Sequence, residues 1–291
     1  MAASTDFRVL VASDGSLPST AAVVTAAHWP WPAGTRMFGI VAEPLPVDGR
    51  AQLRAAAAQV AEDARAAAER TLKRRWPDVA VSRAPGDPAA VIIREARRTR
   101  ADVIVMGWRG HGVMRRLLMG SVSRGVVRHA NCSVLVVRRA ARQLRQVVIG
   151  YDGSPNADRA VRYVARLVPR GTMVTLAMAV QFVRGPAQSL ATAAAAGSIA
   201  EEVKRVNAKR QRDARRMLDK AATPLRESGC KVDYRVTDQA PLDALLAACT
   251  ARKADVLAVG ATGATGLRDL LVGSVAQGAL DRSTIPVLVV R

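Results

Sequence analysis

The sequence contains two copies of one pattern, and this duplication limits the folds that the chain can adopt. The segment FRVLVASDGSLPSTAAV begins at Phe7, and RQVVIGYDGSPNADRAV begins at Arg145. Two later segments begin with ADVIVMG and ADVLAVG. They align with each other without a gap as far as the closing strand of each copy. Self-similarity on this scale indicates a repeated structural unit. We therefore expect two domains of the same fold, spanning residues 1–140 and 146–291.

Each copy alternates short apolar runs with longer helical patterns. The runs at 9–12 and 147–150 are followed by Asp-Gly-Ser, which predicts a strand and then a turn. Long helices are expected at about 50–75 and 199–227. Five strands alternating with four helices favour parallel pairing with right-handed crossovers. The expected fold class is α/β, with two tandem flavodoxin-like (Rossmann-like) domains. Each has a five-stranded parallel sheet of order 3-2-1-4-5 with helices on both faces.

The composition favours some classes of protein over others. Lys and Arg outnumber Asp and Glu by 44 to 24, which gives a net charge of +20. No apolar run approaches the roughly 20 residues that a membrane-spanning helix needs, and the first residues do not resemble a secretory signal. The cysteines Cys132, Cys230 and Cys249 are too few for a disulfide framework. We therefore expect a reduced, cytoplasmic protein that does not bind membranes.

A candidate site follows from the strand order. In an open parallel sheet a ligand lies beyond the carboxyl ends of the strands where the order reverses, here between strands 1 and 4. Asp14 and Asp152 end the first strand of each copy. The fourth strand is followed by the spacing G-x2-G-x9-G-S, formed in the two copies by Gly107, Gly110, Gly120 and Ser121 and by Gly260, Gly263, Gly273 and Ser274. Glycine-rich backbone and a helix N-terminus favour phosphate, whereas the acid is suited to ribose hydroxyls.

The Asp-Gly-Ser turn, the doubled glycine spacing and the closing VLVVR strand together resemble the universal stress protein family in its tandem, ATP-binding form. The resemblance covers almost the whole chain. It implies one ATP site per domain, with or without Mg2+, with adenine near strands 2 and 4 and the triphosphate on the glycine loop. The ATP-binding residues that it implies are, in domain 1, Ala12, Asp14, Ile40, Met106, Gly107, Gly110, Gly120, Ser121, Val122 and Ser123, and, in domain 2, Gly150, Asp152, Met178, Val259, Gly260, Gly263, Gly273, Ser274 and Val275.

The two loops differ in the residues around their shared glycines. Ser123 of the first copy corresponds to Ala276 of the second. The second loop carries Arg268 beside Asp269. The cations of the first loop are Arg109, Arg115 and Arg116. We therefore expect domain 1 to bind ATP at least as tightly as domain 2.

Three functions stay open. The first is an ATP-binding stress-response or signalling protein whose output depends on nucleotide occupancy. A slow ATPase or phosphotransferase is the alternative, although the loops share no carboxylate to serve as a base, and no catalytic residue or metal site is assigned. Nucleic-acid binding rests on charge alone. The apolar final strands predict an internal pseudo-dimer of the two domains, with a homodimer of the whole chain as a further alternative.

Overall fold

The strands and helices follow the duplicated order. The computed structural model describes residues 6–43, 51–110, 119–184, 193–263 and 272–291. The strands are β1 (Arg8–Ser13), β2 (Arg36–Glu43), β3 (Ala80–Pro85), β4 (Val103–Gly107), β5 (Ser133–Val137), β6 (Gln146–Gly150), β7 (Met173–Ala179), β8 (Lys231–Thr237), β9 (Val256–Gly260) and β10 (Val287–Val290). The helices are α1 (Leu17–His28), α2 (Ala51–Lys73), α3 (Pro88–Thr99), α4 (Ser121–His129), α5 (Pro155–Leu167), α6 (Ala193–Ala221), α7 (Thr223–Glu227), α8 (Pro241–Arg252) and α9 (Ser274–Arg282).

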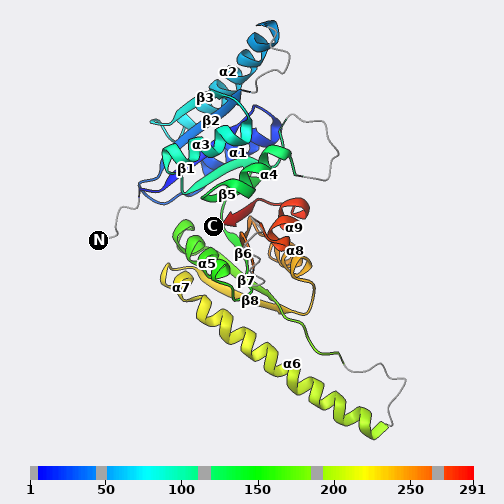
Figure 1. Ribbon diagram of the computed structural model, residues 1–291. Coiled ribbons are helices and arrows are strands. Elements are labelled where there is room, and N and C mark those ends of the chain that lie inside the picture. The colour runs from blue at the N-terminus through cyan, green and yellow to red at the C-terminus, as the bar shows by residue number, and fades with distance from the viewer. Residues whose placement is uncertain (1–5, 44–50, 111–118, 185–192, 264–271) are drawn as a thin grey trace.

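These strands form one continuous sheet of ten, in the order β3-β2-β1-β4-β5-β10-β9-β6-β7-β8. Within each half every pair is parallel, so both halves have the predicted order 3-2-1-4-5. At the centre β5 and β10 pair antiparallel, with Leu135 opposite Leu288. The two halves are therefore joined edge to edge through their final strands, as the apolar edges predicted (Figure 1).

Helices cover both faces of the sheet and bury its Val-rich strands. One core lies between the sheet and the helices α1, α2, α5, α6 and α7, and includes Leu72 and Leu218. The other lies under α3, α4, α8 and α9, and includes Ile104 and Leu257. Strands buried on both faces explain the continuous apolar runs in the sequence. Among the helices that the structure describes, none is both long and apolar enough to cross a membrane.

The long helix of the second half differs from its prediction. One helix is expected at 199–227, but the structure has α6 and then the short helix α7, with Ala222 between them. Pro224 lies in the first turn of α7. Proline has no N–H to continue the hydrogen-bond ladder of a preceding helix, which explains the break. α6 is 29 residues long, whereas its counterpart α2 has 23.

Candidate functional site

The acid at the end of the first strand is held in the same turn in both halves. The Ser16 N–H donates to Asp14 Oδ1 over 3.0 Å, and the Ser154 N–H donates to Asp152 Oδ1 over the same distance. The residue between each pair is a glycine with a φ near +80°, a conformation that other residues rarely adopt. The turn also starts a helix, because Ser16 and Ser154 cap α1 and α5.

The glycine loop after the fourth strand lies against that acid. A side chain at Gly110 would overlap Asp14 Oδ2, and a Cβ at Gly263 would lie 2.8 Å from Asp152 Oδ2. The loop also touches the neighbouring helix, since a Cβ at Gly107 would lie 2.7 Å from the Ser19 nitrogen. The acid and the loop are thus brought together in both halves, so close that a side chain on the loop glycine would displace the carboxylate.

The third glycine of each loop starts the last helix. Gly120 and Gly273 are the N-caps of α4 and α9. Glycine has no side chain, so neither N-cap residue accepts a hydrogen bond from the first N–H groups of its helix. In the first half the buried Ser123 hydroxyl donates to the Gly107 carbonyl over 2.8 Å and ties α4 to the end of β4. The equivalent residue Ala276 cannot make this bond.

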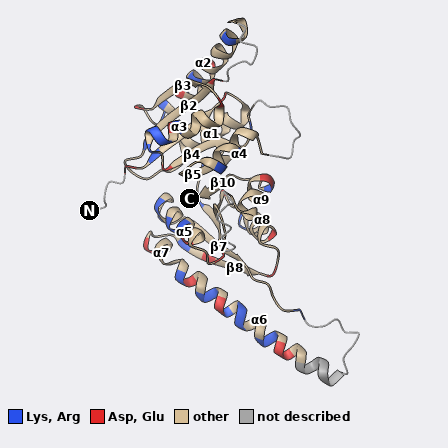
Figure 2. Cartoon of the chain, viewed as in Figure 1, with Lys and Arg blue, Asp and Glu red and all other residues tan. Residues whose placement is uncertain are grey.

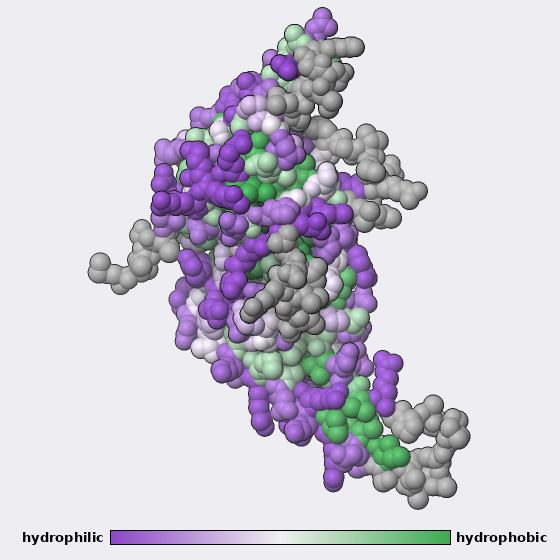
Figure 3. Space-filling model, in the orientation of Figure 1, coloured by the Kyte–Doolittle hydropathy of each residue, from purple (hydrophilic) through white to green (hydrophobic). Residues whose placement is uncertain are grey.

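A cavity of about 1070 Å³ opens at this point in the first half. Its lining combines polar groups of the β1 turn, the glycine loop and α4 with apolar side chains of β2, α2, α3 and β4. Nine of the ten residues implied for domain 1 line it, namely Ala12, Asp14, Met106, Gly107, Gly110, Gly120, Ser121, Val122 and Ser123. Hydrophobic surface framed by hydrophilic side chains is visible in the upper half of Figure 3.

Ile40 is the exception. Its side chain is 1% exposed and packs in the core, while Val41 and Ala42 line the cavity. Ile40 pairs with Ala12 inside the sheet, and the residue on the same face nearer the carboxyl end of the strand is Ala42. Ile40 therefore lies outside the cavity, and Ala42, two residues further along β2, lines it. In the second half Gly150 pairs with Ala177, so Met178 corresponds to Val41.

The sequence interpretation missed a whole wall of the cavity. Ala56, Ala57, Val60 and Ala61 of α2 line it, and Val60 is 57% exposed. Ala61 belongs to the buried stripe of α2, but Ala56, Ala57 and Val60 lie nearer the start of the helix. An exposed run of small apolar residues on a helix that borders the strand 1–strand 4 crevice was the available signal. Arg109, Arg124, Arg128 and His129 also line the cavity.

The corresponding positions of α6 in the second half are charged. A Cβ at Gly15 would meet Ala64 of α2, and a Cβ at Gly153 would meet Met217 of α6. These contacts place Ala64 and Met217 at equivalent positions, at the same offset of 153 as the last third of the two copies. The residues equivalent to Ala56, Ala57 and Val60 are then Lys209, Arg210 and Asp213. The Arg210 guanidinium donates to the Gln181 carbonyl.

The first glycine loop is also linked to the second half. The Arg138 guanidinium lies 4.0 Å from the centre of the Trp108 ring, the residue directly after Gly107. Arg138 Nη2 donates to the Leu280 and Asp281 carbonyls at the end of α9. Reciprocally, Arg291 Nη2 donates to two carbonyls at the end of α4. Each half therefore caps the last helix of the other.

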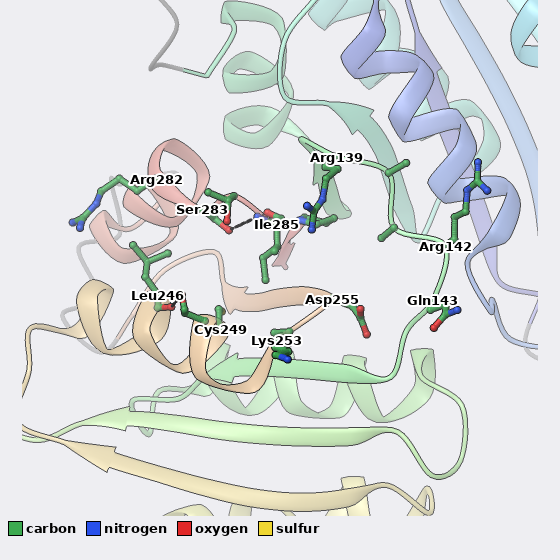
Figure 4. Close-up of a pocket in the computed structure, with 16 residues that line it drawn as sticks. Arg139, Arg142, Gln143, Leu246, Cys249, Lys253, Asp255, Arg282, Ser283 and Ile285 are labelled. Carbon is green, nitrogen blue, oxygen red and sulfur yellow. Dashed lines mark hydrogen bonds between the residues drawn. The ribbon is translucent and has the colours of Figure 1, made fainter.

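A second cavity, of about 680 Å³, lies away from the glycine loops (Figure 4). It is bounded by the linker at 139–143, the end of α8 and the turn between α9 and β10. The carboxylate of Asp255 accepts the Arg145 and Gln146 N–H groups there. Burial raises the pKa of the Cys249 thiol on its wall to about 12. None of the implied ATP-binding residues lies in this cavity.

Arg115 and Arg116 of the first loop, and Arg268 and Asp269 of the second, lie outside the described residues. The difference in loop charge therefore stays a prediction. Arg109 is described, and its guanidinium lies 4.4 Å from the centre of the Trp108 ring.

The fold and the crevice define a tandem α/β protein of the flavodoxin-like class. The sequence profile of the universal stress protein family matches residues 7–138 and again 143–291. The chain belongs to the universal stress protein family. Its structure is similar to that of a universal stress protein from Archaeoglobus fulgidus, with a TM-score of 0.69, 19% identity and 98% of both chains covered.

Curated relatives share parts of the sequence. A universal stress protein of Mycolicibacterium smegmatis is 30% identical over 197 residues, which are 66% of this chain and 62% of that protein. A universal stress protein A-like protein of Arabidopsis thaliana is 43% identical over 56 residues, which are 19% of this chain and 32% of that protein. The chain thus spans between a third and two thirds of the length of these relatives.

Proposed function

We propose that the cavity of the first half binds ATP and that the protein is a nucleotide-dependent stress-response or signalling protein. The observation that carries this proposal is the lining of one cavity, which combines an apolar wall, a helix N-terminus and a carboxylate. A nucleotide has three parts that match these features: a flat apolar base, a hydroxylated ribose and an anionic phosphate chain.

The phosphates are assigned to the glycine loop and the start of α4. Uncapped N–H groups and the helix dipole both favour an anion at Gly120 and Ser121. Arg109 adds a positive charge to the wall of the same cavity. Asp14 would repel phosphate, so it is assigned to the ribose hydroxyls. Mg2+ is usually held by substrate phosphates with few carboxylates, and any Mg2+ at this site would be bound mainly through the triphosphate.

The base is assigned to the apolar end. Val41, Ala42, Val60 and Met106 present aliphatic surface there. Burying the exposed part of the Val60 side chain under a base contributes about 25 cal/mol for each Å² removed from water. The base therefore supplies affinity through contact area and the phosphate end supplies orientation.

We also propose a second ATP site in the second half, weaker than the first. It has the same turn, glycines and helix start, but Lys209, Arg210 and Asp213 replace the small apolar wall. Seating a base against these residues would partly desolvate charged groups, which is unfavourable. Ala276 cannot form the hydrogen bond that Ser123 makes, which should further weaken ATP binding at the second site.

The proposed domain bounds remain 1–140 and 146–291. We also propose that the protein acts in the cytoplasm.

The first test is purification under native conditions, followed by nucleotide extraction and identification. Bound ATP is the expected result, and bound ADP would favour the slow ATPase instead. Isothermal titration calorimetry with ATP, ADP and cAMP then measures affinity and stoichiometry. The variant Asp14→Ala should lose the tighter site and Asp152→Ala the weaker one. Absence of any nucleotide binding, or a larger loss from Asp152→Ala, would refute the assignment.

A wall exchange gives a sharper test. The double variant Ala57→Arg, Val60→Asp places the second-half wall in the first cavity, at positions outside the core. It should weaken ATP binding at the first site by at least about tenfold, a difference of 1.4 kcal/mol. The reverse exchange, Arg210→Ala with Asp213→Val, should strengthen the second site. Unchanged affinities in both directions would show that the base does not contact this wall.

A further inference from the structure

The outer face of α6 carries a row of cations. The helix extends away from the body of the protein, and blue positions outnumber red ones along it (Figure 2). Its inner side packs through Ala214 and Leu218, which are 4% and 0% exposed. The exposed cations of its outer side, here called the α6 basic face, are Lys204, Arg205, Lys209, Arg212, Arg215, Arg216 and Lys220. At 100° per residue these seven fall within a sector of about 160°, opposite Ala214 and Leu218.

Most of these cations are not neutralised by nearby acids. Lys204 has Glu201 at 4.0 Å, and the other six form no ion pair with any residue that the structure describes. Asp219 of the same helix is engaged elsewhere, because it accepts hydrogen bonds from Arg226 and Tyr234. The α6 basic face is therefore a surface of concentrated positive charge whose potential is felt by anions in solution.

The first half provides an internal comparison. The positions of α2 that are equivalent to the α6 basic face hold Ala51, Gln52, Ala56, Gln59, Glu62, Asp63 and Ala67. These positions thus hold seven cations in one copy and two acids without a cation in the other, and the three acids in the same sector of α6, Glu201, Glu202 and Asp219, leave that face with a net positive charge. A general excess of arginine in the chain, or a requirement of the fold, would act on both copies alike. The α6 basic face is therefore a separate feature of the second half.

We propose that the α6 basic face binds the phosphate backbone of a nucleic-acid duplex without reading its sequence. Lys204 and Lys220 are 16 residues apart, which is about 24 Å along a helix. An α-helix of this kind fits the major groove of about 12 Å, or can lie along the phosphates at its edge. Lys and Arg contacts to phosphates fix position and supply affinity, but they carry no sequence information.

An anionic membrane is the less suitable partner. Helices that lie in a membrane surface present an apolar face next to the basic one. On the C-terminal part of α6 that side is occupied, because Ala214 and Leu218 are buried against the protein. The basic face alone remains available there, which suits a partner that is recognised by charge.

The test measures fluorescence anisotropy of a fluorescein-labelled 24-base-pair DNA duplex of mixed sequence between 50 and 200 mM salt. The full chain should bind, with affinity falling steeply as salt rises. Each phosphate contact contributes about 0.9 to the slope of log K against log salt. The variant Arg205→Gln, Arg212→Gln, Arg215→Gln, Arg216→Gln should lower this slope by up to about 3.6 and weaken binding by more than about tenfold.

A charge-matched control separates the face from net charge. The variant Arg94→Gln, Arg97→Gln, Arg142→Gln, Lys253→Gln removes four exposed cations elsewhere and should retain most of the wild-type slope. Equal losses from both variants would assign binding to overall charge and overturn the proposal. So would a wild-type chain that does not bind the duplex at 50 mM salt, or one that binds phosphatidylserine vesicles more tightly than the duplex.

Folding is checked by circular dichroism. Should the fourfold variant unfold, the single changes Arg212→Gln and Arg215→Gln at exposed positions serve in its place. Each should lower the slope by about 0.9. Single variants that are folded and leave the slope at its wild-type value would also overturn the proposal.

Discussion

The reciprocal caps at the centre of the molecule predict an unequal pair of mutants. Arg138 and Arg291 each donate two hydrogen bonds to the last carbonyls of a helix in the other half. A half-buried guanidinium at a helix C-terminus should contribute about 1–2 kcal/mol to the free energy of unfolding. Arg138 also stacks on Trp108 at 4.0 Å, which adds about 0.5–2 kcal/mol. The position equivalent to Trp108 is Ala261, which has no ring.

We therefore expect Arg138→Ala to destabilise the protein by about 1 kcal/mol more than Arg291→Ala. Urea unfolding followed by circular dichroism measures both values. A double-mutant cycle with Trp108→Ala should give a coupling energy of about 1 kcal/mol between Trp108 and Arg138. Arg138→Lys keeps the charge but not the planar fork, so its loss should lie in between. Equal losses from the two alanine variants, with no coupling to Trp108, would refute the stacking argument.

Three further predictions concern single side chains. Ser123→Ala removes the bond to the Gly107 carbonyl, so it should lower the free energy of unfolding by about 1–2 kcal/mol in thermal or urea unfolding and weaken ATP binding at the first site. Burial raises the pKa of the thiols of Cys132 and Cys249 to about 11 and about 12, so both stay protonated at pH 8. Both thiols should therefore react with a thiol reagent far more slowly in the native protein than in the unfolded protein. Rapid labelling of the native protein would contradict this prediction. ATP should change the tryptophan fluorescence through Trp108, which adjoins the loop, and Trp108→Phe should abolish most of that change.

The strand order and the meeting of acid and glycine loop could be predicted because each depends on local signals. Apolar runs, turn residues and the glycine spacing fix the strands and bring Asp14 to the loop. The position of Ile40 could not be fixed in the same way, since its register relative to Ala12 is set by pairing between strands. A register error moves a residue along the strand or to the other face. The break before α7 had a visible signal in Pro224, which the prediction of one long helix passed over.

The wall of the cavity was unpredictable for a different reason. Helical periodicity identifies the residues of α2 that face the core, such as Ala64 and Leu72, because burial selects apolar side chains there. Val60 also contributes to the cavity, yet its side chain is largely exposed. Periodicity cannot distinguish such a position from ordinary surface. Its role becomes visible only when the helix is seen beside the β1 turn and the glycine loop.

The two copies therefore differ where the fold permits it. A side chain at Gly110 would overlap Asp14, and one at Gly263 would crowd Asp152, so a change of either glycine would move the acid beside it. The solvent-facing positions of the long helix are under no such restriction, because residues such as Val60 and Asp213 are not required by the core. Changes there alter the wall of the cavity and the outer charge without disturbing the sheet. The geometry thus separates a fixed glycine loop from a variable helix, and the variable helix is where the two halves are expected to differ in affinity and in partner.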